Sequence, residues 1–280
     1  MSTPPAILRM PALQRVPGLA WRDGRLHDSY RALPVESAVA LTYNGSTHAV
    51  MMASPADLED FAIGFSLAEG IIDAPGDIEE LRSVEGSHGI DLQMWLNPVL
   101  AERHAARRRF MAGPTGCGLC GIESLEQAVK APAAVSAEPR FTPEMIAEAL
   151  ASLPAAQRLN AETRAMHAAG YWEPGSGLVA LREDVGRHNA LDKLAGALAR
   201  NEQTAQRGLL LLTSRVSVEM VQKAARLGVP AIVAVSAPTS LALSMATAAG
   251  ITLIAVARGA EFEVFSRPDR LLPGVSDHVA

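Results

Sequence analysis

Short runs in which apolar and polar residues alternate fill much of the first third of the chain, a pattern typical of strands in antiparallel sheets. Residues 35–43 and 47–53 are two such runs, joined through Asn44-Gly45, the dipeptide that best suits a tight hairpin turn. Residues 78–84 and 90–96, separated by a turn of glycine, serine and histidine, predict a second hairpin.

A helix is predicted between these two hairpins. Ser54 is a suitable N-cap and Pro55 a suitable first residue, and apolar residues continue from there towards Gly70. The first part of the chain is therefore expected to be a small α+β domain. Two prolines and several small residues make residues 131–140 the best candidate linker, which predicts domains at 1–135 and 136–280.

Beyond the candidate linker, short apolar runs alternate with helical stripes, which is the rhythm of βαβ units. The runs lie at residues 178–181, 209–212, 231–235 and 251–256. We expect an α/β domain with a mostly parallel sheet covered by helices, and such sheets bind ligands beyond the carboxyl ends of their strands. Three polar turns follow predicted strands, at residues 183–189, 213–217 and 236–240.

The composition fits a globular protein outside the membrane. The chain has 280 residues, of which 49% are hydrophobic and 20% charged, enough for a sizeable buried core. No apolar run approaches the roughly 18 residues that cross a bilayer, and residues 1–18 lack the pattern of a signal peptide. We therefore expect a cytoplasmic location. A net charge of −5 argues against general nucleic-acid binding.

The only two cysteines, Cys117 and Cys120, lie in a loop that holds three glycines, residues 116–121. In a reducing compartment such a pair indicates reactivity or metal binding rather than a stabilising disulfide. A helix predicted at residues 122–130 would place both sulfurs near its positive N-terminal end, which favours the thiolate. Basic residues at 103–109, just before the loop, could lower a thiol pKa further or hold an anionic partner.

A zinc site is disfavoured by the residues around these cysteines. Nucleobase deaminases hold zinc with a Cys-x-x-Cys pair and a histidine, and they use a glutamate two residues after that histidine. None of the seven histidines is followed by such a glutamate, and two cysteines cannot build a four-cysteine structural site. We therefore expect no metal. Thioredoxin-like redox chemistry has the right spacing, but the loop does not follow the first strand of an evident βαβ unit.

The turn at residues 183–189 concentrates acids, an arginine, a histidine and an amide between a predicted strand and a predicted helix. Asp184, His188 and Asp192 follow at intervals of four, so an early helix start would place the imidazole between two carboxylates. Helix capping with surface ion pairs explains the same residues equally well. His167, at a predicted strand start, is expected to be a hydrogen-bonded core histidine.

Hydroxyls and an arginine gather at two predicted helix N-termini, where free backbone amides favour phosphate. Arg215 and Ser217 lie in one turn, and Thr239 lies in the next. Capping alone explains either turn, but the two turns together with Arg187 favour an anion pocket for a nucleotide or pterin phosphate. We count His188 among the same candidates. The chain has no Walker-type loop and no G-x-G-x-x-G motif.

Four segments resemble, in order, signatures of the FdhD family of formate dehydrogenase accessory sulfurtransferases. They are residues 61–72 (FAIGFSLAEGII), 117–121 (CGLCG), 183–193 (EDVGRHNALDK) and 214–224 (SRVSVEMVQKA). The resemblance spans roughly residues 35–270. It implies a C-terminal α/β domain with the cytidine-deaminase-like fold, emptied of its zinc chemistry, behind a smaller N-terminal α+β domain.

The resemblance also implies an activity. Members of this family take sulfur from a cysteine desulfurase as a persulfide. They pass it to molybdenum in the bis(molybdopterin guanine dinucleotide) cofactor, a bound substrate destined for molybdenum-dependent formate dehydrogenase. By position, Cys117 would hold the persulfide and Cys120 would assist or relay. The guanine nucleotide moiety would suit Arg187, Arg215, Ser217 and Thr239. Further implied cofactor contacts are Phe262, Glu263, Val264, Phe265, Ser266 and Arg267.

Two alternatives stay open. A thiol-disulfide oxidoreductase would use the same loop, whereas a non-enzymatic chaperone that binds a nucleotide or cofactor would not need the cysteines at all. The spacing does not decide which cysteine carries sulfur. The alanine-rich segment 240–249 would serve a homodimer as well as a core.

Overall fold

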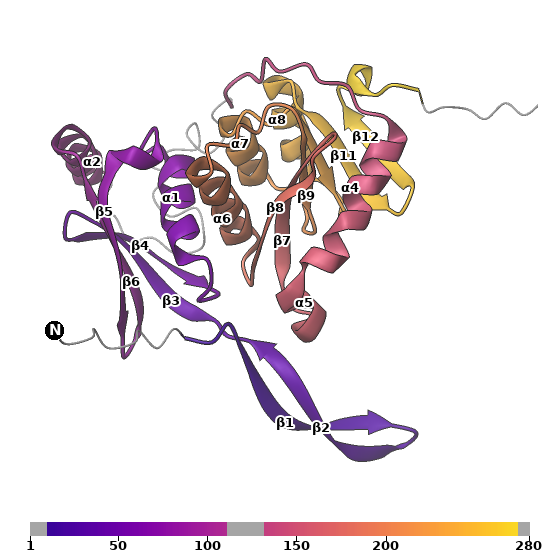
Figure 1. Ribbon diagram of the computed structural model, residues 1–280, viewed down its shortest axis with the longest axis horizontal. Coiled ribbons are helices and arrows are strands. Elements are labelled where there is room, and N and C mark those ends of the chain that lie inside the picture. Colours follow the sequence, from indigo (N-terminus) through magenta and orange to yellow (C-terminus); the bar gives the residue numbers. More distant parts are fainter. Residues whose placement is uncertain (1–9, 111–131, 274–280) are drawn as a thin grey trace, which may run out of the picture.

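The computed structural model describes residues 10–110 and 132–273. The cysteine loop and the helix predicted at residues 122–130 lie outside the described residues. Figure 1 shows a long two-stranded ribbon, then a four-stranded sheet with its helices, then a larger six-stranded sheet with helices on both faces. Among the described residues, no helix is both long and apolar enough to cross a membrane.

The chain begins with a ribbon that the sequence analysis did not predict. Strands β1 (Leu13–Arg22) and β2 (Arg25–Pro34) pair antiparallel along their whole length, around a turn at Asp23-Gly24. Both turn residues have positive φ, 51° and 76°, which the Asp-Gly dipeptide adopts readily.

The two predicted hairpins are confirmed, and they join into one sheet with strand order β4-β3-β6-β5. The strands are β3 (Ser37–Tyr43), β4 (Ser46–Ala53), β5 (Ile78–Gly86) and β6 (Gly89–Leu96). Helix α1 (Leu58–Glu69) packs on one face, where Phe61 and Phe65 meet Leu41, Leu92 and Met94. The short η1 (Pro75–Asp77) precedes β5, and helix α2 (Pro98–Phe110) follows β6.

Helix α1 begins later than predicted, so the N-cap assigned to Ser54 is wrong. Asp57 is the N-cap, with a left-handed backbone at φ 52°. Ser54 is fully buried, its N–H donates to Asp184, and its hydroxyl accepts from the N–H of Val185. A capping rule considers only neighbours in sequence, and this serine is used by a strand end 130 residues away.

The second half of the chain forms a six-stranded sheet with order β12-β11-β10-β9-β7-β8. Its strands are β7 (His167–Glu173), β8 (Gly177–Asp184), β9 (Leu209–Leu212), β10 (Ala231–Ala234), β11 (Thr252–Arg258) and β12 (Glu261–Ser266). Each of the four apolar runs predicted as strands coincides with a strand of this sheet, except that Val235 and Ile251 lie one residue outside β10 and β11. The mixed α/β class predicted for the chain is confirmed.

The sheet is less parallel than predicted. Only the pairs β9–β10 and β10–β11 are parallel, whereas β7–β8, β7–β9 and β11–β12 are antiparallel. For β7–β8 and β11–β12 the reason is local, because residues 174–176 and 259–260 are connections too short for a crossover and can only join antiparallel neighbours.

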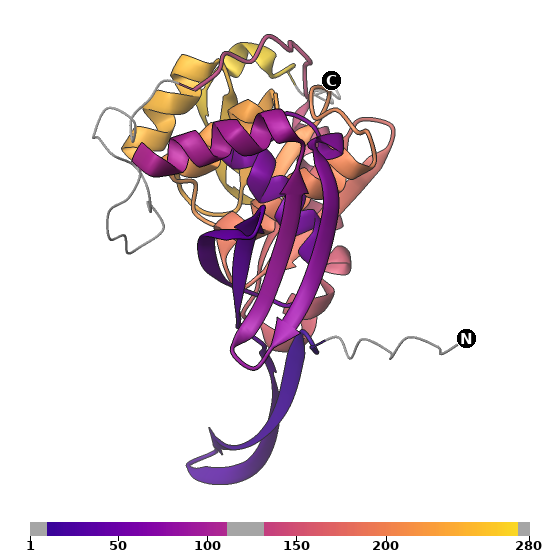
Figure 2. The same cartoon turned by 90° about the vertical axis from the view of Figure 1, so that its left-hand side faces the viewer.

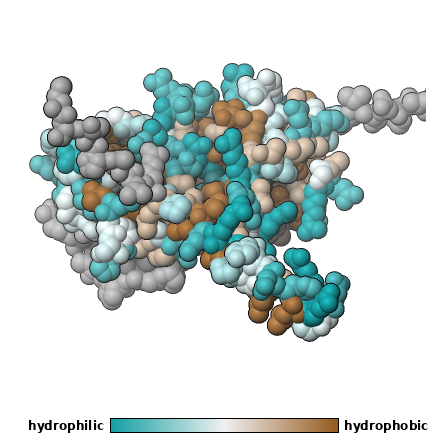
Figure 3. Space-filling model, turned by 60° about the horizontal axis from the view of Figure 1, so that its bottom comes forward, coloured by the Kyte–Doolittle hydropathy of each residue, from teal (hydrophilic) through white to brown (hydrophobic). Residues whose placement is uncertain are grey.

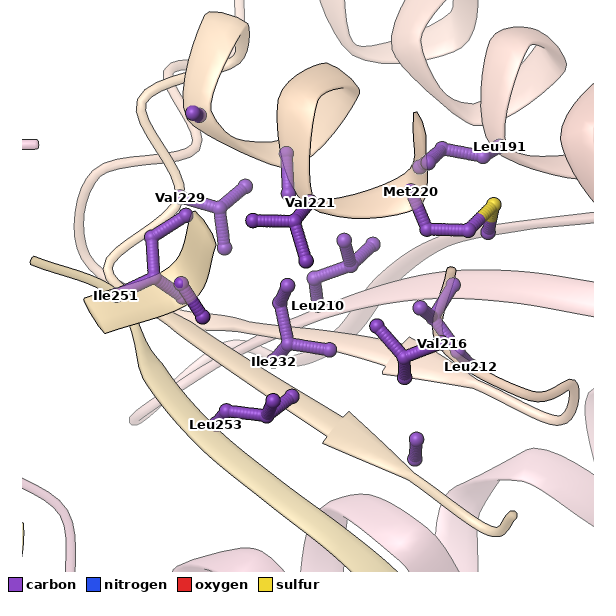
Figure 4. Close-up of a cluster of buried hydrophobic side chains, with 14 of the residues drawn as sticks. Leu191, Leu210, Leu212, Val216, Met220, Val221, Val229, Ile232, Ile251 and Leu253 are labelled. Atoms are coloured by element: carbon purple, nitrogen blue, oxygen red, sulfur yellow. The ribbon is translucent and has the colours of Figure 1, made fainter. Parts of the chain in front are cut away.

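Helices cover this sheet on both faces. They are α4 (Pro143–Ala156), α5 (Arg158–Thr163), α6 (Arg187–Arg200), α7 (Val218–Arg226) and α8 (Ser240–Ala249), with η2 (Pro268–Arg270) after the last strand. Along β9, Leu210 and Leu212 pack towards α6, α7 and α8, and Leu209 and Leu211 pack towards α4. Figure 4 shows the first of these cores, with Val221 of α7 over the central strands. Burial on both faces explains why β9 and β10 read as unbroken apolar runs.

The two sheet units meet where α1 crosses α6 (Figure 1). A Cβ added to Gly64 of α1 would overlap the carbonyl of Asp192, and one added to Gly196 of α6 would overlap the carbonyl of Asp60. The candidate linker has no regular structure at residues 132–140. It lies against the second unit, since Val135 is buried and donates its N–H to the Ala249 carbonyl. The domain boundary itself stays a prediction.

Candidate functional site

The polar turns that follow β8, β9 and β10 lie at one edge of the large sheet, as the strand-end argument predicts. The turns after β9 and β10 are neighbours, because Val216 and Pro238 form a β-bridge and the Thr239 N–H donates to the Val216 carbonyl at 3.0 Å. Strand β7 runs the opposite way, so His167 at its start lies at this same edge. We call this the carboxyl edge.

Asp184 at the end of β8 organises the innermost part of the carboxyl edge. Its carboxylate accepts four hydrogen bonds: from Lys193 at 2.6 Å, Gly186 N–H at 2.7 Å, Asn189 at 3.0 Å and Ser54 N–H at 3.0 Å. The side chains of Asp184 and Lys193 are completely buried. Every lone-pair direction of this carboxylate is in use, so Asp184 joins the two units rather than facing a ligand.

The predicted arrangement of His188 between two acids is wrong. Asp184 binds Lys193, and Asp192 binds Lys223 with both of its oxygens at 2.6 Å. Helix α6 begins only at Arg187, so Asp184 belongs to the strand and does not share a helical face with His188. His188 turns instead towards the next helix, where its Nε2 lies 2.8 Å from Glu219 and 3.4 Å from the Ser217 hydroxyl.

Electrostatics at the carboxyl edge reflect this contact. The hydrogen bond from His188 is the main cause that lowers the pKa of Glu219, so its carboxylate stays charged. Burial lowers the pKa of the half-buried His167, and the neighbouring Arg187 lowers it further. His167 therefore favours its neutral form.

Arg187 is the candidate anion ligand that the structure leaves least satisfied. Its Nε is buried and has no hydrogen-bond partner among the described residues. Arg215 in the next turn is exposed. Ser217 is the N-cap of α7, but its side chain makes no capping hydrogen bond, whereas the Thr239 hydroxyl accepts from the Ala242 N–H at 3.2 Å and is used as a cap. Arg187 and Arg215 are thus the charged groups left for an anion at the carboxyl edge, whereas the Ser217 hydroxyl already lies 3.4 Å from His188 Nε2.

The structure does not place the whole of segment 262–267 at the carboxyl edge. This segment is β12 and the residue after it, and it crosses the sheet from the carboxyl edge to the opposite one. Ser266 is buried and bonded to Leu253 N–H and the Ile251 carbonyl. Arg267 binds Glu138 at 3.0 Å and Asp269 at 2.8 Å.

The remaining members of the segment divide between surface and core. Glu263 is exposed, Phe262 and Val264 pack against the core under α4, and Phe265 packs against the core on the other face. Contact of these residues with a cofactor stays a prediction.

A hollow lies between α1, α6 and α7, apart from the carboxyl edge. Its volume is about 200 Å³, and its lining includes Leu67, Leu191 and the Asp192–Lys223 pair. Burial raises the pKa of Asp192, and Lys223 beside it opposes that shift.

The sequence analysis missed two functional or linking groups. Glu219, the partner of His188, lies two residues beyond Ser217 in a helix N-terminus that the analysis had already selected, so the signal was present. Asp60 of α1 is buried and binds Arg182 of β8 at 2.7 Å and Arg200 of α6 at 2.8 Å. No spacing rule connects Asp60 with the two arginines, because each of them lies more than a hundred positions after it.

The basic segment before the cysteine loop is only partly described. Arg103 of α2 donates to the Ile71 carbonyl at 3.3 Å and lies 3.5 Å from Asp73. His104 is buried, and its Nε2 lies 3.1 Å from Nδ1 of His48. Both residues hold α2 against the first unit. The side chains of Arg107, Arg108 and Arg109, like Cys117 and Cys120, lie outside the described part.

Comparisons with known proteins agree on one family. The model of the FdhD/NarQ family matches residues 34–272. A sulfur carrier protein FdhD from Agrobacterium fabrum is 54% identical over 260 residues, covering 92% of this chain and 96% of that protein. A sulfur carrier protein FdhD from Cupriavidus necator is 47% identical over 251 residues, covering 90% of this chain and 87% of that protein.

A solved structure supports the same relationship. The crystal structure of a candidate formate dehydrogenase accessory protein from Desulfotalea psychrophila matches with a TM-score of 0.76 at 25% identity. The match covers 94% of this chain and 100% of the other.

Proposed function

The chain belongs to the FdhD/NarQ family, and from that premise we propose that it is a sulfurtransferase that carries sulfur as a cysteine persulfide. The sulfur comes from a cysteine desulfurase and goes to the molybdenum of a bis(molybdopterin guanine dinucleotide) cofactor, which then enters formate dehydrogenase. The observation that carries this proposal is the 54% identity, over 92% of the chain, to a protein named as a sulfur carrier. The Cys-x-x-Cys loop supplies the chemistry.

In the loading step, the Cys117 thiolate attacks the terminal sulfur of the donor's persulfide. A new sulfur–sulfur bond forms on Cys117, the donor's sulfur–sulfur bond breaks, and the donor cysteine leaves as a thiolate. Cys120 assists or relays the sulfur. The transfer requires the two cysteines to meet a donor protein first and a bound cofactor afterwards, and glycine, of which the loop sequence has three, is the residue that restricts the backbone least.

The carboxyl edge supports the cofactor half of the proposal. A guanine dinucleotide presents phosphates. Groups that bind phosphate are the Nε of Arg187, which has no partner among the described residues, the exposed Arg215, and the N-terminus of α7, which Ser217 does not cap with its side chain. His188 and Glu219 together hold the neighbouring turn in place. The bound metal cofactor is the substrate here, and the chain's own residues bind and orient its nucleotide.

Guanine nucleotide binding tests the carboxyl edge directly. We expect GDP to bind the unaltered chain and to bind an Arg187→Ala, Arg215→Ala double variant at least about tenfold more weakly, because two charge-assisted contacts are lost. Arg140→Ala is the matched control. Arg140 is exposed like Arg215, but it belongs to none of the three turns of the carboxyl edge and instead precedes Phe141, which forms a β-bridge with Leu271 after η2. Undiminished GDP affinity in the double variant would remove the carboxyl edge from the proposal.

The sulfur step is tested by mass spectrometry of the cysteine loop after incubation with a cysteine desulfurase and cysteine. We expect one added sulfur atom on Cys117. A Cys117→Ser variant should lose both this mass and the maturation of the client dehydrogenase. Full maturation by Cys117→Ser would end the sulfur-carrier proposal.

The Cys-x-x-Cys spacing also favours a second candidate, a thiol-disulfide oxidoreductase. Cys120→Ala separates the two functions. A dithiol redox enzyme needs both sulfurs to complete its cycle, whereas a carrier retains transfer through Cys117 alone. Full dehydrogenase maturation after alkylation of the loop would instead favour a cofactor-binding chaperone in which the cysteines are incidental. The cytidine-deaminase-like arrangement of the second unit and the cytoplasmic location remain predictions alongside this proposal.

A further inference from the structure

The hollow between α1, α6 and α7 lies where the two sheet units meet. Most of its wall is apolar, formed by side chains that include Leu67, Ile72, Leu191, Ala195 and Leu227. The exposed apolar side chains of the β1–β2 ribbon, by contrast, lie on a projecting arm (Figure 3). Small-molecule sites are concave, mostly apolar and frequent where two units of a protein meet. The hollow has the shape and position of such a site, and the ribbon does not.

Two polar contacts join α6 to α7, one helical turn apart. His188 contacts Glu219 at 2.8 Å, and four residues further along each helix Asp192 contacts Lys223 at 2.6 Å. The second contact lines the hollow, whereas the first lies at the carboxyl edge. The hollow is therefore a separate place in the fold, one turn further along both helices.

Within the Asp192–Lys223 pair, the cation is the member that a ligand can reach. The side chain of Asp192 is 1% exposed, whereas that of Lys223 is 15% exposed. Each oxygen of Asp192 accepts a hydrogen bond from the Lys223 ammonium. An ammonium has three N–H donors, so Lys223 has one left beyond these two bonds.

Arg226 brings a second cation to the rim of the hollow. Its exposed side chain donates from Nη1 to the Ala68 carbonyl at 3.2 Å, and the other N–H groups of the guanidinium remain as donors. The lining has one further acid, Asp73, whose side chain is 74% exposed. Helix α2 runs across one end of the β5–β6 hairpin (Figure 2), and its Arg103 lies 3.5 Å from Asp73. The charge of Asp73 thus faces water and a cation of its own.

Charge and volume together define the ligand. Asp192 already neutralises Lys223, so Arg226 supplies a single surplus positive charge, which suits one negative charge. The volume of about 200 Å³ holds several waters at about 30 Å³ each, but it is smaller than the roughly 300 Å³ at which pockets for drug-sized ligands begin. The ligand must be a small molecule with a compact apolar body.

We propose that this hollow binds a small organic monoanion, a compact apolar body that carries one carboxylate. The carboxylate accepts charge-assisted hydrogen bonds from Lys223 and Arg226, and the body packs against Leu67, Leu191 and Leu227. The ligand contacts both units, since Leu67 belongs to α1 and the other residues to α6 and α7. The site depends neither on the sulfur chemistry nor on the nucleotide assigned to the carboxyl edge.

Three probes with the same apolar body and different head groups test this site. Benzoate, benzamide and benzylamine are anionic, neutral and cationic at neutral pH, and a ligand-observed NMR titration measures the affinity of each for the full chain. We expect benzoate to bind at least about tenfold more tightly than the other two, because only benzoate accepts from both cations. Equal affinities, or tighter binding of benzylamine, would overturn the proposal.

Two substitutions separate the head group from the body. Arg226→Met keeps an apolar side chain at the rim, so it should weaken benzoate about tenfold and leave benzamide unchanged. Ala68→Leu places a larger side chain in the lining and should weaken both probes. Arg140→Met is the matched control, since Arg140 is exposed and does not line the hollow. Circular dichroism checks that each variant is folded, and benzoate binding that neither Arg226→Met nor Ala68→Leu weakens would refute the site.

A third variant distinguishes the hollow from the carboxyl edge. The Arg187→Ala, Arg215→Ala double variant should bind benzoate as tightly as the unaltered chain does. A loss of benzoate affinity in this variant would place the anion at the carboxyl edge and overturn the proposal. Loss of GDP binding alone bears on the carboxyl edge, and benzoate binding that survives it supports a separate site.

Discussion

Lys193 and Asp184 form an ion pair from which water is completely excluded, with both side chains 0% exposed. Removing one member of such a pair leaves an uncompensated buried charge, which is far more costly than losing an exposed pair. Lys193 also donates to the Ser54 carbonyl at 2.9 Å, so it holds the start of the α1 segment against α6. Its role is therefore structural and spans both units.

We expect Lys193→Met to lower the free energy of unfolding by about 3 kcal/mol or more, measured by urea denaturation. Arg207→Met is the matched control, because Arg207 pairs with Glu173 but its side chain is 79% exposed. The control should change stability by less than about 1 kcal/mol. Equal losses of unfolding free energy in the two variants would show that the buried pair contributes no more to stability than an exposed pair.

His167 makes stability depend on pH. Burial and Arg187 lower its pKa in the folded chain, so the unfolded chain takes up a proton first as the pH falls. The contribution of His167 is complete above the ordinary histidine pKa of about 6.5 and is progressively lost below it.

We therefore expect the unaltered chain to lose more stability between pH 7.5 and pH 5 than a His167→Gln variant does, both values flanking the usual pKa of about 6.5. Urea denaturation at several pH values gives the measurement. His88→Gln, at the exposed turn between β5 and β6, is the control and should follow the unaltered chain. A steeper loss in His167→Gln would contradict the assigned direction.

The crossing of α1 and α6 depends on two glycines. An alanine in place of a glycine normally stabilises a helix by about 1 kcal/mol. The sign of the stability change on such a substitution therefore tests how closely the two helices pack at this crossing. At Gly196 the added Cβ would overlap the backbone of Asp60, and backbone of a packed helix cannot move aside as a flexible side chain does.

We expect Gly196→Ala to destabilise the chain by about 2 kcal/mol, despite the gain in helix propensity. Gly76→Ala is the control, because a Cβ there meets nothing within 4 Å. Thermal unfolding of the two variants compares them directly. A more stable Gly196→Ala would mean that the two helices separate easily.

Elements were predictable from the sequence where their evidence is local. Alternation and Asn44-Gly45 located the first hairpin, and unbroken apolar runs located β9 and β10. The β1–β2 ribbon was missed although Asp23-Gly24 is an equally good turn signal, because neither face of the ribbon is buried and the apolar pattern is correspondingly weak. The sequence analysis also did not predict which strands of the large sheet pair antiparallel, since this direction depends on the lengths of the connections rather than on the strands themselves.

The sequence predicted which turns lie at the carboxyl edge, but it did not predict which side chains pair there. Strand-end geometry placed Arg187, Arg215, Ser217 and Thr239 at one edge, and the structure brings their turns together. The sequence analysis did not predict how the charged groups pair. His188 binds Glu219 of α7, and Asp184 and Asp192 bind Lys193 and Lys223 instead.

At the scale of the whole molecule, the two sheet units are joined by more than a linker. Asp60 binds Arg182 and Arg200 across the crossing, and Asp184 accepts the Ser54 N–H from the other unit. Separating the units would expose buried charges and leave their hydrogen bonds unmade, a large cost compared with the stability of a typical domain. The predicted division at residue 135 therefore need not produce two independently unfolding domains.

We expect both units to unfold in a single transition, and two tryptophans report on them separately. Trp95 lies on β6 of the first unit, and Trp172 is buried on β7 of the second. In variants that keep only one of these tryptophans, the others replaced by phenylalanine, fluorescence should give coincident urea midpoints. Asp60→Ala, which removes the carboxylate that Arg182 and Arg200 share, should separate the midpoints or lower both together. Two distinct midpoints in the unaltered background would show that the crossing of α1 and α6 does not couple the units.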